Sequence, residues 1–174
     1  TGRYVDFAIN QLLTKWNSLK RKRSRLTIFV SDHGEEFWDH GSNRLDPDPY
    51  NCGLLHGHTL YNELLLVPWV ISWPEAGLPS RLVTDLVSLI DLTPTLIGLL
   101  ELDEDTSMMH GRCLAEYLTS VAPPSNLARI VFADSLRWGR ERQAAMTSTH
   151  KLIRCRETGQ SELYAWGSED PEEK

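Results

Sequence analysis

The stretch LTIFVSDHG, residues 26–34, decides which fold the chain adopts. Its first five residues form a continuous β-favouring apolar run, which is typical of a strand buried on both faces, as in a parallel sheet. In open α/β sheets, ligands bind at the carboxyl ends of the strands. Asp32 and His33 follow such an end, and both residue types bind divalent metals. Gly34 lets the chain turn tightly there because it has no Cβ. This turn is therefore a candidate metal site.

The neighbouring segments alternate between helical and strand patterns. Apolar residues from Val5 to Leu19 recur at helical spacing, and Pro94 suits the first turn of a later helix. Up to residue 120 we expect a helix over 5–19, the strand 26–30, a loop over 41–53, a short helix over 59–65, a second buried strand over 67–73, a strand or helix lead-in over 87–90, a helix from Asp91 or Thr93 to Leu100, and a brief helix ending at Leu118.

The last third of the chain has a different pattern. Four short strand-like runs, residues 129–134, 143–148, 151–155 and 162–166, follow one another without intervening helices. Consecutive strands of this kind favour an antiparallel sheet. The sequence thus predicts an α/β part over residues 1–120 and a small antiparallel subdomain over residues 121–174.

Composition excludes several classes of protein. The 174 residues are 41% hydrophobic and 24% charged, as in a globular protein, and no run is long enough to span a bilayer. The net charge of −6 disfavours a nucleic-acid partner, and we interpret the basic residues 20–25 as a solvated helix end. The chain has no initiator Met and no signal pattern at its start, so we expect it to be part of a longer protein. The three cysteines are Cys52, Cys113 and Cys155; without any CxxC they indicate neither a zinc site nor a disulfide framework.

Histidines gather around one loop. An Asp-His-Gly turn alone is weak support for a metal site, because Asp and Gly are common in turns. Four of the six histidines, however, lie between positions 33 and 58 and not on apolar faces: His33, His40, His56 and His58. Core packing does not account for such clustering after a strand end, so the metal-site interpretation gains support.

The order of these motifs resembles the sulfatases of the alkaline-phosphatase superfamily. The similar blocks are SDHGE at 31–35, DHG at 39–41, HGHTLYNELLLVP at 56–68, VSLIDLTPTL at 87–96, GRCL at 111–114, THKLI at 149–153 and ELY at 162–164 followed by Asp170-Pro171. The resemblance implies the carboxy-terminal half of a three-layer αβα catalytic domain with a mostly parallel, here truncated, sheet. A truncated sheet exposes edges and apolar surface, so we expect residues 1–174 alone to aggregate.

The resemblance also implies roles for individual residues. Asp32 and His33 match the family's metal-binding pair. His56 matches the basic residue that contacts the sulfate or phosphate and could act as a general acid, with His58 as the alternative because the local alignment is ambiguous. His40 matches a family histidine near the pocket mouth, where a substrate contact and a loop-stabilising role are equally compatible. Arg112 and Trp138 stay without a role.

The attacking group of the family is a formylglycine made in a Cys/Ser-x-Pro-x-Arg motif. None of the three cysteines lies in such a motif, so we expect the nucleophile and two further metal-binding aspartates on an amino-terminal part. The resemblance implies one divalent cation, calcium in most sulfatases, although an imidazole ligand suits manganese or zinc better. The implied substrate is a small-molecule or glycan sulfate ester, and the implied location is periplasmic or secreted. The alternatives are a phosphoryl or phosphonate ester hydrolase or transferase, and a non-catalytic relic.

Overall fold

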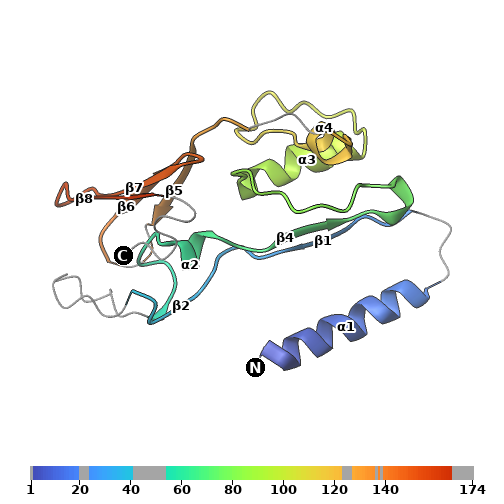
Figure 1. The fold of residues 1–174 in the computed structure, drawn as a ribbon, viewed down its shortest axis with the longest axis horizontal. Helices are drawn as coiled ribbons and strands as arrows, with labels where there is room; N and C mark the ends of the chain where they lie inside the picture. Colours follow the sequence, from blue (N-terminus) through green and yellow to red (C-terminus); the bar gives the residue numbers. More distant parts are fainter. Residues whose placement is uncertain are drawn as a thin grey trace.

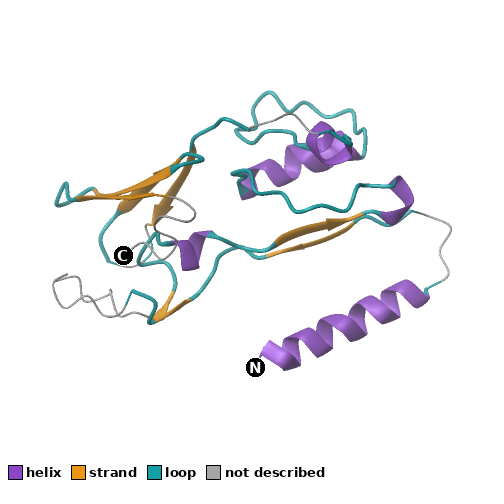
Figure 2. Cartoon of the chain, in the orientation of Figure 1, coloured by secondary structure: helices purple, strands orange, loops and turns teal. Residues whose placement is uncertain are grey.

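A computed structural model of the chain describes residues 2–19, 24–40, 54–122, 127–135, 137 and 139–165. Its helices and strands follow the predicted order closely (Figures 1 and 2). The elements are α1 (Gly2–Ser18), β1 (Thr27–Val30), β2 (Glu36–Phe37), β3 (Leu54–Leu55), α2 (Asn62–Leu65), β4 (Trp69–Ser72), the 3₁₀ turns η1 (Pro74–Ala76) and η2 (Leu89–Asp91), α3 (Leu92–Leu99), α4 (Ala115–Thr119), β5 (Val131–Ser135), β6 (Arg142–Met146), β7 (His150–Cys155) and β8 (Ser161–Ala165). The expected loop over 41–53, with Cys52, and Trp138 lie outside the described residues.

The two buried-type strands pair with each other, but in opposite directions. β1 and β4 are antiparallel, with Thr27 opposite Ser72 and Val30 opposite Trp69. The amide of Ser31 donates to the carbonyl of Pro68 at 3.3 Å, so the chain leaves β1 and enters β4 at the same end. Parallel pairing needs a crossover that returns the chain to the opposite end. Within the described residues every strand pair is antiparallel, and the mostly parallel sheet expected from the sequence is not found there.

Helices lie on both sides of the β1–β4 pair. Figure 1 shows α1 on one side, and α3 with α4 on the other. This mixture of helices and sheets is consistent with the predicted α/β class. Among the described residues, no helix combines the length and the apolar character that crossing a bilayer requires.

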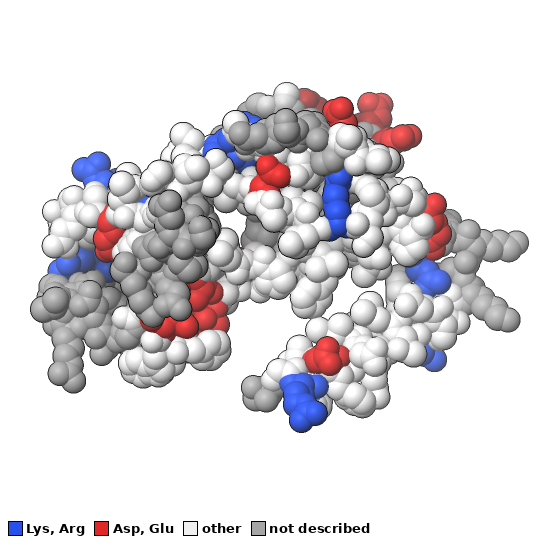
Figure 3. Space-filling view, in the orientation of Figure 1, with Lys and Arg blue, Asp and Glu red and all other residues white. Residues whose placement is uncertain are grey.

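Much apolar surface stays uncovered. No residue of α1 is buried, and Leu12 is 66% exposed on it; uncharged residues make up most of this helix's surface in Figure 3. Phe29 of β1 and Val70 of β4 are also about half exposed. Exposed apolar surface of this extent is typical of interaction sites. At its carboxyl end, α1 is held by Arg25, whose guanidinium donates to the carbonyl of Trp16 at 2.5 Å; residues 20–23 lie outside the described part.

The four carboxy-terminal strands form one meander, as predicted. β5, β6, β7 and β8 pair antiparallel in chain order, with Val131 opposite Met146 in the first pair. One face of this sheet packs on the segment before α2, because Leu60, Ala144 and Ile153 form a buried cluster. The core therefore joins residues on both sides of position 120, and the proposed domain boundary there stays a prediction.

Asp91 anchors the start of α3. It is fully buried, and one of its oxygens accepts from the Ser88 amide at 2.9 Å while the other accepts from the Arg112 amide at 2.8 Å. The guanidinium of Arg129 completes the set through a short ion pair. A buried carboxylate is tolerated only when it is paired and hydrogen-bonded in this way. The sequence predicted Asp91 or Thr93 as the cap of this helix. Asp91 does precede α3, but its side chain makes no capping hydrogen bond to that helix and instead links three segments through Arg112 and Arg129.

Candidate metal and substrate site

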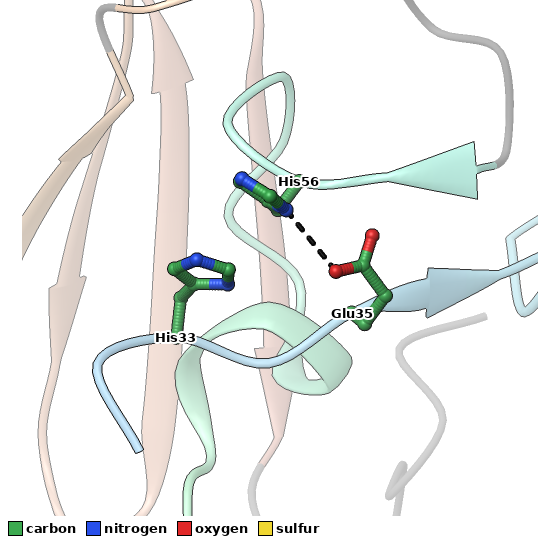
Figure 4. A group of neighbouring side chains, drawn as sticks. All are labelled: His33, Glu35 and His56. Atoms are coloured by element: carbon green, nitrogen blue, oxygen red, sulfur yellow. Dashed lines mark hydrogen bonds and ion pairs between the residues drawn. The ribbon is translucent and has the colours of Figure 1, made fainter. Parts of the chain in front are cut away.

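A two-residue β-ladder places Glu35 beside His56. Glu36 of β2 is opposite Leu55 of β3, so the residues next to them, Glu35 and His56, come opposite each other when the register continues by one step. Directly opposed residues share a face of a ladder. His56 Nδ1 lies 3.1 Å from Glu35 Oε2 (Figure 4). Leu55 has φ = 75°, a conformation rarely adopted by bulky residues, and it directs the chain into His56.

His33 approaches the same place from the end of β1. Its ring centroid is 3.8 Å from that of His56, with the planes tilted by 31° (Figure 4). His33 Nδ1 lies 2.7 Å from the carbonyl oxygen of Gly34. A carbonyl only accepts, so Nδ1 carries a proton, and in the neutral ring the lone pair is on Nε2. A hydrogen bond from the ring nitrogen that does not bind the metal is the usual way in which a protein orients a ligating histidine.

Gly34 allows the β1 turn to press against α2. Its amide donates to the Leu64 carbonyl at 2.9 Å. A Cβ at this position would lie 1.8 Å from the backbone oxygen of Glu63, far inside contact distance. The glycine is therefore required for the close approach that brings His33 toward His56.

Replacing Gly34 by alanine is expected to lower the free energy of unfolding by about 1–3 kcal/mol, because backbone must move to make room. The same variant should bind metal more weakly, since the turn carries His33. Gly2→Ala is the control, because a Cβ at Gly2 meets nothing within 4 Å. Urea unfolding of both variants checks the prediction, and equal stability of the two would contradict it.

The donor atoms near this turn fit a divalent cation. His33, Glu35 and His56 each offer one ligand atom, and these atoms lie within 4.8 Å of one another. Glu35 Oε1 is buried and has no hydrogen-bond partner among the described residues. An orphaned carboxylate oxygen is unfavourable unless a cation or donor reaches it. Two imidazoles with one carboxylate also form a known three-ligand set for zinc that leaves a position open.

His33 and His56 line an open cavity of about 1040 Å³, and Glu35 reaches it only through its contact with His56. Asp32 lies on its wall with 88% of its side chain exposed, and its Oδ2 is 3.7 Å from His33 Nε2. On the other wall, Asp85 accepts from the Tyr117 hydroxyl at 2.5 Å, and this hydrogen bond holds the pKa of that carboxyl below its usual value. Arg137 also lines the cavity and supplies positive charge.

Comparison with known proteins bears on this arrangement. A family model described as Sulfatase matches residues 1–102, more than half of the chain. The chain belongs to the sulfatase family. Among curated proteins, no sequence matches it.

Solved sulfatase structures share the fold. A protein solved in complex with its substrate D-glucosamine-2-N,6-O-disulfate superposes with a TM-score of 0.72 at 19% identity, over 97% of this chain and 33% of that one. A 2-O GAG sulfatase gives 0.65 at 20% identity, over 85% and 30%. A protein from work on the metabolism of multiple glycosaminoglycans by Bacteroides thetaiotaomicron gives 0.66 at 26% identity, over 97% and 36%. The chain thus spans about a third of the length of these structures.

The other two sulfatase-motif histidines point elsewhere. His58 is 3% exposed, and its Nε2 lies 2.6 Å from Glu36 Oε2. His40 Nδ1 lies 2.7 Å from Glu63 Oε1, and its ring stacks on Tyr61 at 3.7 Å. Neither is a lining residue of the cavity. Between the two candidate substrate contacts, this geometry favours His56 over His58, and for His40 it favours the loop-stabilising role.

Tyr61 lies at the junction of α2 and the carboxy-terminal sheet. Its hydroxyl donates to Glu162 Oε2 at 2.9 Å, and the Tyr164 hydroxyl donates to the same oxygen at 2.6 Å. Burial, followed by the charge of Glu162, raises the pKa of Tyr61 well above its usual value. Both phenols therefore stay protonated and act as donors that hold the sheet against α2.

The main addition to the sequence-based site is Glu35. The sequence indicated Asp32 and His33 as metal ligands and His56 as the substrate contact, and the structure places all three on one cavity. Their roles stay predictions. Glu35 carries no signal of its own in the sequence, because the two-residue ladder that turns it toward His56 is too short to leave an alternating pattern. The Arg112 amide donates to Asp91, and the Arg112 guanidinium donates to the Ala128 carbonyl at 3.3 Å.

Proposed function

We propose that this chain forms the metal-binding part of a sulfuric ester hydrolase. The observation that supports the proposal best is the cluster of His33, Glu35 and His56, whose two histidines line an open cavity, in a chain of the sulfatase family. The substrate class we propose is a sulfate ester of a glycan or small molecule. Two structural relatives, one bound to a sulfated glucosamine and one described as a 2-O GAG sulfatase, make a sulfated sugar the first choice.

In this proposal His33 Nε2 and Glu35 Oε1 would hold the cation, with Asp32 at the rim as a further ligand. A bound divalent cation supplies positive charge that offsets the charge of the sulfuryl group in the transition state. Such an ion would contact His33 Nε2, which already lies 3.7 Å from Asp32 Oδ2, and would satisfy the orphaned Oε1 of Glu35. Calcium is the family expectation, and the imidazole donor also suits manganese or zinc.

His56 has a different part in the reaction. Glu35 Oε2 accepts from His56 Nδ1, which orients the ring. His56 Nε2 then donates its proton to the ester oxygen as the sulfur–oxygen bond breaks, so that the alcohol leaves neutral. Glu35 would join the two functions, with one oxygen on the cation and the other on the proton donor.

We further propose that a longer catalytic domain completes this site and supplies the attacking group. The chain spans about a third of the similar structures. Phe29, Val70 and the apolar residues of α1 are exposed here, which fits surfaces covered by further strands and helices. In that domain the β1–β4 pair would belong to the larger sheet of a three-layer αβα fold. The upstream coding sequence, read for Cys/Ser-x-Pro-x-Arg and paired aspartates, tests this part.

The decisive experiment compares 4-nitrophenyl sulfate and 4-nitrophenyl phosphate as substrates of the complete polypeptide. We expect faster sulfate cleavage, its loss after chelation and its return with calcium, manganese or zinc. Glu35→Gln and Asp32→Ala should each reduce kcat/KM by more than about 100-fold, since even outer-shell partners of a metal are worth about 10- to 100-fold. Glu104→Gln, an exposed carboxylate outside the cavity, is the control.

The outcomes separate the alternatives. If Asp32→Ala and Glu35→Gln both retained metal and turnover, the site assignment would be wrong. Faster phosphate cleavage would identify the second candidate, a phosphoryl or phosphonate ester hydrolase or transferase; its supporting observation is the imidazole-containing donor set, which suits manganese or zinc. No cleavage and no retained metal would indicate a non-catalytic relic.

A further inference from the structure

A second cluster of ligand-type side chains lies behind the cavity. Glu36, His40 and Glu63 each offer one ligand atom, and these atoms lie within 4.8 Å of one another. Glu36 follows Glu35 in an extended segment, where successive side chains point to opposite faces. Glu35 therefore turns toward His56, while Glu36 points to the opposite side and is fully buried. None of the three residues of this inner cluster lines the cavity.

The two carboxylate oxygens of Glu36 differ in their contacts. Its Oε2 lies 2.6 Å from His58 Nε2, while its Oε1 is buried without a hydrogen-bond partner among the described residues. Leaving a buried carboxylate oxygen unsatisfied costs more than a hydrogen bond contributes. This is the arrangement expected of a metal ligand, because a ligating carboxylate commonly has its other oxygen fixed by a neighbouring side chain.

Glu63 brings a second carboxylate close to that of Glu36. Glu63 Oε1 lies 2.7 Å from His40 Nδ1, and both side chains are only about 15% exposed. Two carboxylates held close together out of water repel each other unless protons or a cation compensate. In a tetrahedral zinc site with bonds of about 2 Å, ligand atoms are about 3.3 Å apart. Small side-chain movements would bring the donor atoms from their present separations onto one ion.

We propose that Glu36, His40 and Glu63 bind a second divalent cation, zinc by the chemistry of the donors. The ion would tie the β2 segment to the first turn of α2. It would act as a structural clamp, because its ligands come from two separate segments and do not face the cavity. By fixing Glu36, it also fixes the direction of Glu35 on the opposite face. This inference goes beyond the proposed ester hydrolysis and does not depend on it.

The competing account of the same contacts is two imidazolium–carboxylate pairs, His58 with Glu36 and His40 with Glu63, and no ion. The two accounts differ in metal stoichiometry. The complete polypeptide is stripped with a chelator, titrated with zinc chloride and dialysed, and bound zinc per chain is measured by mass spectrometry. We expect wild-type protein to retain one equivalent more than Glu63→Gln, and the same difference after Glu35→Gln is introduced into both backgrounds.

Cobalt supplies a spectroscopic signature. Co²⁺ at a four-coordinate site absorbs strongly in the visible range, so Glu35→Gln loaded with cobalt should keep a band that Glu63→Gln/Glu35→Gln lacks. Glu104→Gln serves as the exposed control and should match wild type. If Glu63→Gln does not fold, zinc should still raise the melting temperature of Glu35→Gln by several degrees.

Equal zinc content in wild type and Glu63→Gln would overturn the proposal. So would the absence of a zinc-dependent rise in the melting temperature of Glu35→Gln. Both readouts are independent of ester cleavage. A protein that retains the inner ion but cleaves no sulfate would therefore refute only the proposed function.

Discussion

Replacing His56 by alanine is expected to lower kcat/KM for the sulfate ester by about 10²- to 10⁴-fold, the range that a positioned general acid contributes. The structure supports this size of effect because Glu35 Oε2 holds His56 Nδ1 at 3.1 Å and the ring lines the cavity. Without the imidazole, the ester oxygen must leave with its negative charge. The measurement is steady-state hydrolysis of 4-nitrophenyl sulfate and of an ester with a poorer, alkyl leaving group.

The choice of substrate sharpens this test. 4-Nitrophenolate leaves easily without a proton, so the loss should be smaller for that ester than for the alkyl one. His56→Ala should also keep its metal, in contrast to Glu35→Gln. His110→Ala is the matched control, because His110 is an exposed histidine that does not line the cavity. Equal losses for both esters, or loss of metal with His56→Ala, would make His56 a ligand and not the proton donor.

Replacing Asp91 by alanine is expected to destabilise the protein by about 3–5 kcal/mol, as for other buried ion pairs that lose one partner. The Arg129 guanidinium, which is 6% exposed, would be left buried without its carboxylate. The amides of Ser88 and Arg112 would lose their acceptors in the same step. Denaturant unfolding of the complete polypeptide measures the loss.

Two further variants serve as controls for Asp91→Ala. Asp103→Ala removes an exposed carboxylate and should change stability by less than about 0.5 kcal/mol, as is usual for surface positions. Asp91→Asn preserves shape and one carbonyl acceptor but not the ion pair, so its loss should lie between those of the two alanine variants. A loss below about 1 kcal/mol for Asp91→Ala would show that the hydrogen bonds at the start of α3 are dispensable.

The sequence predicted most elements of the fold because their signals are local. The apolar run before Ser31 gave β1, helical spacing from Val5 gave α1, and the four short strands after residue 129 gave β5 to β8. Strand direction is not a local property. A continuous apolar run suits any strand covered on both faces, and the antiparallel pairing of β1 with β4 follows from where residues 31–68 return the chain.

The candidate site could likewise be predicted only in part from the sequence. Asp32, His33 and His56 could be identified because their residue types and order carry a chemical signal and resemble sulfatase motifs. The pairings of Glu35 with His56, and of Glu36 with His58, depend on a ladder between β2 and β3, whose residues lie far apart in the sequence. A two-residue ladder leaves no periodic pattern, so these contacts became visible only in three dimensions.

Glu35 and Glu36 point to opposite faces of the β2 segment, so the function of each depends on the strand register. A shift of one residue in the register between β2 and β3 would turn both carboxylates to the other side and exchange the donor beside His56 with the buried donor. A shift of two residues would keep the order of faces. Changes of register in this ladder are therefore restricted to even steps.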